Sequence, residues 1–387
     1  MGRENTVGIL GGGQLARMMI LEGAPLGVQF RILDTAEAPC ASTLAPSQCA
    51  DWRDESALAQ FAETVDVATF DFENVPAETA QWLAGRVTVH PQPRALAVAQ
   101  DRLAEKTLFR DIGLDTARFV TVDTREDLER AVREIGLPAI LKTRRLGYDG
   151  KGQFRLRRPG DADAAWQALG AQAARHGLIL EAFVPFEEEV SVLAVRGRDG
   201  DFRTWPLTRN WHADGILSLS LAPAPVSDAI TGQACDHART LAERLEYVGV
   251  FALELFVRDG RVLGNEMAPR VHNSGHWTYD GAVTSQFQNH VRAVLGLPLG
   301  DVSARGPSLM FNWIGSMPDR EAALVVPDLH WHDYGKSPRP GRKVGHATLC
   351  APDMETLRER ACAVAAALGR EDQLAPMLAM SDAPACP

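Results

Sequence analysis

Apolar and polar positions in the first part of the chain follow a pattern of short strands joined to helices. VGIL at residues 7–10 is an apolar run, GGGQLA follows it, and a second run, FRILD, ends at Asp34. Short apolar runs bounded by glycine favour buried strands, and the glycine-rich segment favours a turn into a helix. A further strand is predicted over VATFDFENV, which ends at Val75. The stretch to about residue 95 is therefore predicted to be βαβ.

The next part of the chain predicts a helix followed by a small lobe. The helix runs from about Pro93 to Ile112 and stops at Gly113, and the first domain boundary lies inside it or just after it. Residues 114–184 hold the strand-like segments PAILK and LILEAFV and an Ala-rich helical segment near residues 161–176. This mixture predicts a small α+β lobe.

A larger lobe and a short final segment follow. The larger lobe begins with the alternating EVSVLAV, has a helix near residues 228–246, and returns as the predicted hairpin VFALELFVRDGRVLGNEM. From about residue 300 there are short strands, GRKVGHATL among them, and a helix near residues 353–369. The fold class is predicted to be α/β and α+β, with domains at residues 1–108, 109–298 (lobes 114–184 and 185–298) and 299–387.

Composition and charge exclude several classes of partner. The 387 residues carry a formal charge of −10, which opposes a broad surface for nucleic acid, because phosphate binding needs clustered Lys and Arg. No apolar run is long enough to span a membrane, and MGRENTVGIL lacks the pattern of a secretory leader. We therefore expect a cytoplasmic protein that binds neither nucleic acid nor membrane.

A glycine turn near the amino terminus matches a dinucleotide fingerprint. Gly11, Gly13 and Ala16 fit G-x-G-x-x-A after a strand, and Asp34 falls where a ribose-binding acid would lie. The physical content of this motif is more general, since backbone N–H groups and a helix N-terminus can bind any phosphate. Three alternatives stay open here: a tight turn without a ligand, a site for NAD, and a site for another phosphate.

A second glycine-rich segment follows a strand lysine. Lys142 ends PAILK, and GYDGKGQ occupies residues 147–153. Bare amides can wrap phosphate oxygens while lysine neutralises their charge, so this segment favours a phosphate clamp, although it is not the Walker sequence. The alternative is a surface turn with a solvated lysine.

Two carboxylates in the predicted hairpin favour a magnesium site. If residues 258–260 form a three-residue loop, Glu254 and Glu266 lie on the same face of the sheet, whereas a two-residue turn would put them on opposite faces. Glu254 lies among apolar residues, where an unpaired carboxylate is costly. Magnesium prefers such convergent oxygens beside phosphates. The alternative is a pair of acids on a solvated face.

The hairpin is followed at once by a polar run, which contains Arg270, His272, Asn273, Ser274 and His276. Such a run is either a loop rich in local hydrogen bonds or a loop that anchors a substrate. Its closeness to Glu266 favours the second interpretation. Neither histidine is expected to bind magnesium, which prefers oxygen ligands.

Together, the segments QDRLAEK, GYDGKGQ, EAFVPFEEEVS, NEMAPRVHNSGHWT and PGRKVGH resemble the ATP-grasp superfamily. Within it they resemble most the family of N5-carboxyaminoimidazole ribonucleotide synthetases of purine biosynthesis, and the resemblance covers nearly the whole chain. It implies an ATP-grasp fold with an amino-terminal βαβ (Rossmann-like) domain and a small carboxyl-terminal domain, in a homodimer. It also implies an ATP-dependent ligase that joins bicarbonate to the amine of aminoimidazole ribonucleotide, with Mg2+, or Mn2+ in its place.

The resemblance assigns roles to individual residues. The implied ATP-binding residues are Arg102, Lys142, Gly147, Tyr148, Asp149, Gly150, Lys151, Gly152, Gln153, Glu181, Ala182, Phe183, Val184, Glu189, His212, Asn265 and Glu266. The implied ribonucleotide-binding residues are Gln14, Leu15, Glu73, Tyr148, His272, Asn273 and Lys343. Catalytic roles are implied for Asp149, Tyr148, Lys151, Lys343 and Arg270, and metal binding for Glu254 and Glu266, with Arg342 an equal alternative to Lys343.

Three rival functions remain open at this stage. A related ATP-grasp ligase would use formate or an amino acid in place of bicarbonate. A nicotinamide-dependent oxidoreductase would be built on GGGQLA and Asp34, but it leaves the acid pair and GYDGKGQ unexplained. A non-catalytic nucleotide sensor is disfavoured, because a sensor does not need both Glu254 and Glu266.

Asp149 is the group expected to orient or deprotonate the amine, so Asp149→Asn should keep ATP affinity and lose product formation. Nucleotide binding and carboxylation rate measure the two effects separately. An unchanged carboxylation rate would contradict the assignment.

Overall fold

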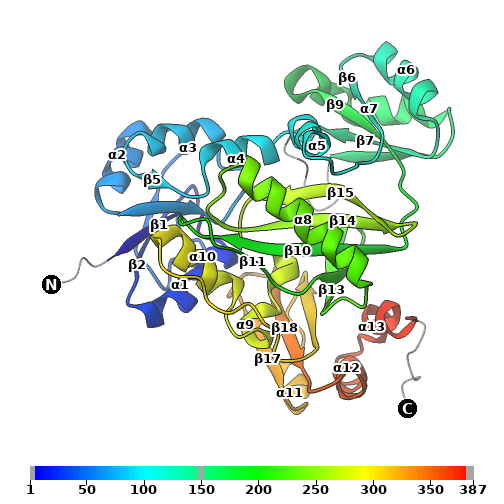
Figure 1. Ribbon diagram of the computed structural model, residues 1–387. Helices are drawn as coiled ribbons and strands as arrows, with labels where there is room; N and C mark the ends of the chain where they lie inside the picture. The colour runs from blue at the N-terminus through cyan, green and yellow to red at the C-terminus, as the bar shows by residue number, and fades with distance from the viewer. Residues whose placement is uncertain (1–4, 146, 148–151, 381–387) are drawn as a thin grey trace.

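Three β-sheets organise the chain. The computed structural model describes residues 5–145, 147 and 152–380. In Figure 1 the amino-terminal sheet, in blue, and the small lobe that carries α6 and α7 lie on opposite sides of a central sheet. The strands β10, β14 and β15 of this central sheet run between the two units.

The amino-terminal sheet is parallel, with the strand order β3-β2-β1-β4-β5. Strands buried on both faces are apolar along their length, as VGIL at the centre of the sheet is, whereas the neighbouring FRILD contains the exposed Arg31. Helix α1 of this unit packs against α10 of the central unit around one shared apolar core. The elements are β1 (Thr6–Leu10), α1 (Gln14–Gly23), η1 (Ala24–Leu26), β2 (Gln29–Asp34), β3 (Ser47–Cys49), α2 (Glu55–Glu63), β4 (Val67–Phe70), α3 (Ala77–Ala84), β5 (Thr88–Val89), α4 (Pro93–Ala99) and α5 (Arg102–Asp111).

The small lobe has four antiparallel strands in the order β6-β9-β7-β8. Helices α6 and α7 pack on this sheet around Leu128, Leu141, Leu169 and Leu180. Its elements are β6 (Phe119–Val122), α6 (Arg125–Ile135), β7 (Ala139–Thr143), β8 (Gln153–Leu156), α7 (Asp161–His176) and β9 (Leu178–Ala182).

The central sheet is antiparallel and continues into the last part of the chain. Its order is β15-β14-β10-β12-β13-β16-β18-β17, and β11 pairs with β10 beside this path. Strand β16 pairs with β13, with Phe311 opposite Leu219, so the last strands extend the same sheet. The strands are β10 (Glu188–Arg196), β11 (Phe202–Thr204), β12 (Thr208–Ala213), β13 (Ile216–Ala222), β14 (Gly249–Arg258), β15 (Arg261–Ala268), β16 (Ser308–Ile314), β17 (Leu329–Asp333) and β18 (Lys343–Cys350).

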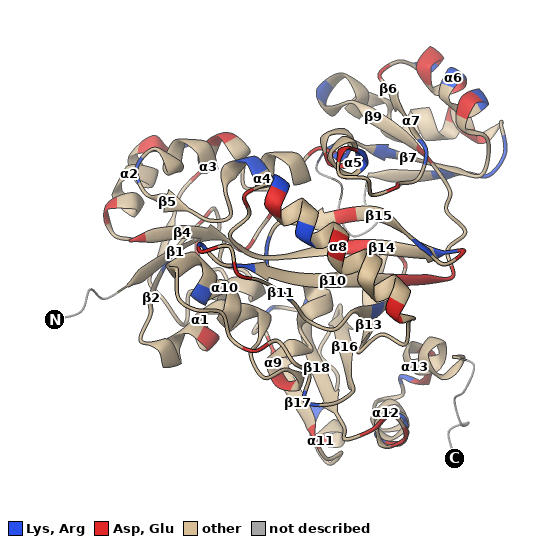
Figure 2. Cartoon of the chain, in the orientation of Figure 1, with Lys and Arg blue, Asp and Glu red and all other residues tan. Residues whose placement is uncertain are grey.

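Helices cover the central sheet. Helix α8 packs against strands β10, β14 and β15, and α12 packs against β16 and β18. The helices of this unit are α8 (Asp228–Arg244), η2 (Asn273–Gly275), α9 (Thr278–Gly281), α10 (Gln286–Leu295), α11 (Arg320–Ala323), α12 (Met354–Leu368) and α13 (Glu371–Leu378). Figure 2 shows charged residues concentrated on helices such as α6 and α8, while most strand positions are uncharged. Within the described residues, no helix combines the length and the apolar character needed to cross a bilayer.

Two predicted elements differ from those in the structure. The strand predicted up to Val75 ends at Phe70, because the chain leaves the sheet where the Asp71 carboxylate bonds the glycine turn. The helix predicted from Pro93 to Ile112 is two helices. Asp101 between them has an extended backbone, and its Oδ1 accepts the amide of Leu103 at 3.0 Å, so it caps α5 instead of continuing α4.

Two carboxylates occupy the glycine turn between β1 and α1. Asp34 Oδ2 accepts the amide of Gly12 at 2.6 Å, and Asp71 Oδ2 accepts the amides of Gly13 and Ala16 at 2.6 and 3.4 Å. A Cβ at Gly11 would lie 1.8 Å from Asp71 Oδ1, so the close approach of this carboxylate requires glycine. These amides are therefore not available to a pyrophosphate, as a dinucleotide site would require.

Asp71 should make stability depend on pH. Burial, with the neighbouring charge of Asp34, raises its pKa from 3.8 to about 7, despite the hydrogen bonds from Ala16 and Gly13. A raised pKa means that the folded protein holds a proton that the unfolded chain releases. The contribution of protonated Asp71 to the unfolding free energy is fully present below about pH 4 and is lost as the pH rises through 7. Wild type should therefore lose unfolding free energy between pH 4 and 8 relative to Asp71→Asn.

Chemical unfolding of both proteins across this pH range measures the difference. Glu63→Gln, at the exposed end of α2, is a matched control and should follow wild type. Parallel pH profiles for wild type and Asp71→Asn would show that Asp71 does not titrate in this range.

Candidate active site

Two adjoining cavities are lined by residues from several strands of the central sheet. The first, of about 340 Å³, lies between the small lobe and strands β14 and β15. The second, of about 730 Å³, lies between the glycine turn and the segment 336–343. Five residues line both cavities and so mark the place where they meet: Glu73, Arg270, His272, Asn273 and Lys343.

A β-bulge brings the two acids of the hairpin together. The loop is a two-residue turn, in which Asp259 and Gly260 have φ of 50° and 70°, so the prediction of a three-residue loop was wrong. The acids nevertheless share a face, because the pairing shifts by one residue between Glu254 and Leu255. Leu255 lies opposite Gly264 and Glu254 lies opposite Glu266, which leaves Asn265 as the extra residue.

The acids of the first cavity suit a divalent cation. Glu254 is buried, and burial together with the charge of Glu266 raises its pKa to about 8. Oxygen ligands converging on one point are what Mg2+ prefers, and a bound cation would hold such a carboxylate in its ionised form. The residues present therefore fit this metal. One oxygen of Glu254, one of Glu189 and one ring nitrogen of His212 also lie within 4.8 Å of one another.

Cations and acids pair closely on the other side of the first cavity. Lys142 Nζ lies 2.8 Å from Glu181 Oε2, and Lys106 Nζ lies 3.5 Å from Glu181 Oε1. Burial alone would raise the pKa of Glu181, but the charges of Lys142 and Lys106 outweigh it and lower the pKa to about 2. Arg102 Nη1 lies 3.2 Å from Glu266 Oε2. The result is a charged wall with three cations next to the hairpin acids.

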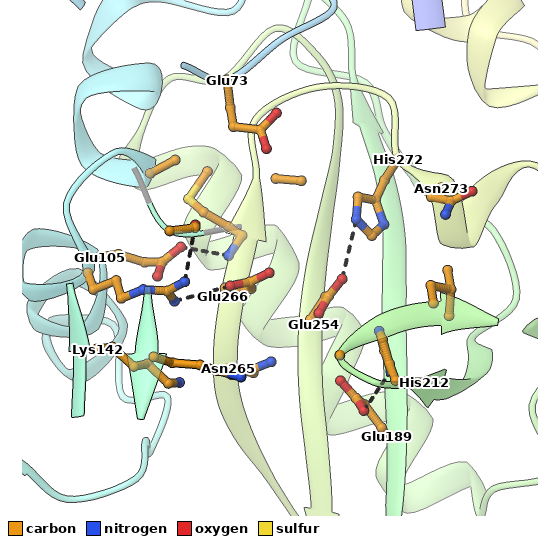
Figure 3. A pocket seen from close by; sticks show the side chains of 18 of the residues that line it. Glu73, Glu105, Lys142, Glu189, His212, Glu254, Asn265, Glu266, His272 and Asn273 are labelled. Carbon is orange, nitrogen blue, oxygen red and sulfur yellow. Dashed lines mark hydrogen bonds and ion pairs between the residues drawn. The ribbon is translucent and has the colours of Figure 1, made fainter. Parts of the chain in front are cut away.

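Glu189 and His212 form a second pair beside Glu254. His212 Nδ1 lies 3.0 Å from Glu189 Oε2 (Figure 3). Burial would lower the pKa of His212, but the hydrogen bond to Glu189 and the charges of Glu189 and Glu254 outweigh it and raise the pKa. An imidazole N–H group and a carboxylate side by side can bind the hydroxyl groups of a sugar, the first as donor and the second as acceptor.

The junction of the cavities combines an ion pair with an unsatisfied amide. The Arg270 guanidinium pairs with Glu73 Oε2, and this charge, with the hydrogen bond from Arg270, outweighs burial and lowers the pKa of Glu73. His272 Nε2 lies 3.3 Å from Glu254 Oε1 (Figure 3). Asn273 is buried, and among the described residues neither its Oδ1 nor its Nδ2 has a hydrogen-bond partner. A buried amide without a partner in a cavity wall is suited to a polar ligand.

The second cavity is cationic at one end. Lys336, Arg339, Arg342 and Lys343 line it, opposite the amino end of α1. In the part of the chain that the structure describes, the amides of Gln14 and Leu15 make no hydrogen bond, unlike those of the preceding turn. Lys336 Nζ contacts Gln14 Oε1 and so joins the two sides. Free amides at a helix N-terminus beside four cations are suited to bind a phosphate.

The structure brings most of the residues predicted from the sequence into these walls. The first cavity is lined by Arg102, Lys142, Gly147, Gln153, Glu189, His212, Glu254, Asn265 and Glu266, and the second by Gln14 and Leu15. Glu181 lies behind the first wall, and Gly152, Ala182, Phe183 and Val184 are not among the lining residues. Tyr148, Asp149, Gly150 and Lys151 lie outside the described residues.

Further residues of the site were not predicted from the sequence, among them two cations of the second cavity and two residues of α5. Lys336 and Arg339 line the second cavity, and their signal in the sequence is a cluster of four cations within residues 336–343. Glu105 and Lys106 lie on the same face of α5 as Arg102, as positions three and four residues apart do. Glu105 Oε1 accepts the amide of Met267 at 2.7 Å and so fixes β15 next to Glu266.

Family models match three successive parts of the chain. A ribonucleotide synthetase preATP-grasp domain matches residues 4–100, an ATP-grasp domain matches residues 107–287, and a phosphoribosylaminoimidazole carboxylase C-terminal domain matches residues 308–360. The predicted ATP-grasp fold, with an additional domain on each side, is thereby confirmed. The domain boundaries drawn from the sequence stay a prediction.

Similar proteins cover almost the whole chain. The N5-carboxyaminoimidazole ribonucleotide synthase of Pseudomonas aeruginosa is 49% identical over 360 residues, which are 93% of this chain and 98% of that protein. The crystal structure of the N5-carboxyaminoimidazole ribonucleotide synthetase of Thermus thermophilus is 50% identical, with a TM-score of 0.89, over 94% of this chain and 98% of that one. The synthase of Aspergillus clavatus, in complex with ADP and 5-aminoimidazole ribonucleotide, is 31% identical, with a TM-score of 0.87, over 96% of this chain and 100% of that one. The chain belongs to the N5-carboxyaminoimidazole ribonucleotide synthase family of ATP-grasp enzymes.

Proposed function

We propose that this chain is a ligase that uses ATP to join bicarbonate to the amine of 5-aminoimidazole ribonucleotide in purine biosynthesis. The products are N5-carboxyaminoimidazole ribonucleotide, ADP and phosphate. The observation that carries the proposal is the junction of the two cavities, where Glu73, Arg270, His272, Asn273 and Lys343 face both. A nucleotide in one cavity and a ribonucleotide in the other would present their reacting ends to these side chains.

The first cavity suits ATP. Glu189 and His212 would bind the ribose, while Lys142 and Arg102 would face the phosphates. In the structure Arg102 is paired with Glu266, so phosphate oxygens would compete with this carboxylate for the guanidinium. Glu254 and Glu266 would then hold Mg2+, or Mn2+, which offsets charge on the transferring phosphoryl group when bound.

The second cavity suits the ribonucleotide. Its phosphate would lie at the amides of Gln14 and Leu15, with Lys336 and Arg339 opposite them. The aminoimidazole ring would then reach the junction near Glu73 and Lys343. The glycine turn therefore serves a phosphate, but not that of a dinucleotide, because Asp34 and Asp71 occupy its other amides.

Bicarbonate is a poor electrophile and must be activated. Its oxygen would attack the γ-phosphorus of ATP, ADP would leave, and the product is carboxyphosphate. The amine nitrogen would attack the carboxyl carbon of carboxyphosphate, or the CO2 released from it, and phosphate would leave.

Arg270 and the unsatisfied amide of Asn273 are suited to hold the anion. Asp149 would take the proton of the amine, and the segment 147–153 would exclude water from the short-lived intermediate.

The protein is further proposed to be a cytoplasmic homodimer with domains at residues 1–108, 109–298 and 299–387, on the basis of the family resemblance. Light scattering of the purified chain tests the dimer. Limited proteolysis tests the boundaries.

Transfer of label from bicarbonate tests the reaction. With ATP, Mg2+ and aminoimidazole ribonucleotide, label should enter an acid-labile carbamate while phosphate is released. Glu254→Gln and Glu266→Gln should each lower kcat by roughly 100-fold or more, since both carboxylates stabilise the phosphoryl group through the metal. Asp199→Asn, at the exposed turn between β10 and β11, is the control and should keep full activity.

Other outcomes separate the rival functions. Phosphate release that depends on formate or on another acceptor would keep the ATP-dependent ligase and reject this substrate. Absence of ATP turnover with every acceptor would reject the ligase.

A further inference from the structure

Four buried polar side chains form a hydrogen-bonded chain that ends at His272. Ser220 Oγ donates to Asn210 Oδ1 at 2.8 Å, and Asn210 Nδ2 donates to Ser191 Oγ at 3.0 Å. Ser191 Oγ donates to Ser274 Oγ at 2.8 Å, and Ser274 Oγ lies 2.9 Å from His272 Nδ1. The four side chains are at most 4% exposed, and none of them lines either cavity. The chain therefore reaches the site only through His272.

A backbone amide fixes the direction of this chain. Hydroxyl groups rotate and an Asn amide can be turned over, so the side chains alone would permit either direction. The amide of Ser274 can only donate, and it lies 3.3 Å from His272 Nδ1. Nδ1 must therefore be an acceptor, which carries no proton. The Ser274 hydroxyl then donates to Nδ1 and accepts from Ser191, in agreement with the direction of the other bonds.

The main chain of His272 is held as firmly as its ring. Gln286 Oε1 accepts the amide of His272 at 2.8 Å, and Gln286 Nε2 donates to its carbonyl at 2.7 Å. Gln286 is completely buried. The amide oxygen and nitrogen of Gln286 thus both bond to the main chain of His272, and Ser274 bonds to Nδ1 of its ring. The orientation of the other ring nitrogen, Nε2, is therefore fixed.

That nitrogen, Nε2, lies 3.3 Å from Glu254 Oε1. Because Nδ1 accepts the amide of Ser274, the one proton of the imidazole ring is on Nε2. The ring therefore presents an N–H group, and not a lone pair, toward the Glu254 carboxylate.

We propose that Ser274, with Ser191, Asn210 and Ser220 behind it, fixes the Nε2–H tautomer of His272, which donates to Glu254. These four are positioning residues, because they act through His272 and touch no substrate. Their effect is to hold the His272 ring so that its N–H group is directed at the Glu254 carboxylate, as hydrogen bonds around metal-binding side chains generally do. The effect on turnover rests on the proposed function, whereas the tautomer is a property of the protein alone.

Nuclear magnetic resonance of the full chain, labelled with 15N at histidine, tests the tautomer without nucleotide or metal. Correlation of the ring nitrogens with the ring protons distinguishes a protonated from an unprotonated nitrogen, and His272→Gln assigns the signals. We expect protonated Nε2 and unprotonated Nδ1. A proton on Nδ1 would overturn the proposal.

Ser274→Ala tests the positioning role. It removes the shorter of the two donors to Nδ1, the hydroxyl at 2.9 Å, and leaves only the more distant amide at 3.3 Å, so the His272 signals should move toward a mixture of tautomers. The kcat for carboxylation should fall roughly 10- to 100-fold, the usual range for such hydrogen-bonding partners, with the KM values for ATP and ribonucleotide unchanged. Ser308→Ala is the matched control, a fully buried serine of β16 in the same sheet, and should leave the spectrum and kcat as in wild type.

Ser191→Ala interrupts the chain one residue further from the ring and serves if Ser274→Ala does not fold. It should move the same signals in the same direction by a smaller amount. Wild-type His272 signals and kcat in both folded variants would overturn the positioning role. If wild type itself carboxylated no ribonucleotide, the proposed function would fail, but the signals of His272 would still decide the tautomer.

Discussion

The register of one β-hairpin decides whether two carboxylates face the same cavity. The Asp-Gly turn alone would place Glu254 and Glu266 on opposite faces of the sheet, because side chains alternate along a strand. One extra residue, Asn265, shifts the pairing and restores the two acids to one face. Because of this shift, both acids lie next to the charged wall that contains Arg102, Lys142 and Glu181. A bulge is a small disruption of the ladder, and it is tolerated here at the end of the sheet, where β15 is the edge strand.

The two halves of the site use carboxylates in opposite ways. In the hairpin, acids face the cavity and are available to a cation. At the glycine turn, Asp34 and Asp71 point into the backbone and use up the amides that a dinucleotide would need. The same fingerprint can thus serve different ligands, and the acids around it decide which amides remain. This explains why the motif alone did not identify the ligand.

Much of the fold follows from local patterns, while the details that complete the site do not. The strands at VGIL and FRILD, the helix from Asp161 to His176 and the presence of the hairpin were predicted, because apolar period and turn residues specify them locally. The break at Asp101 and the bulge at Asn265 were not, since each depends on partners distant in sequence, Arg144 for the first and Glu105 for the strand that carries the second. Lys336 and Arg339 face Gln14 across more than 300 residues, and only the fold brings them together. Most of the candidate site residues were predicted from the family motifs, whereas the side chains that hold them in place became evident only in the structure.

The pairing of β16 with β13 has a consequence for the modular view of this fold. The last segment of the chain matches a family model of its own, yet its strands continue the sheet whose residues line the first cavity. Without it, β13 would be an open edge, which invites association with other chains. The segment that supplies Lys336 and Arg339 therefore also covers this edge, so its removal would change both the second cavity and the exposed edge of the sheet.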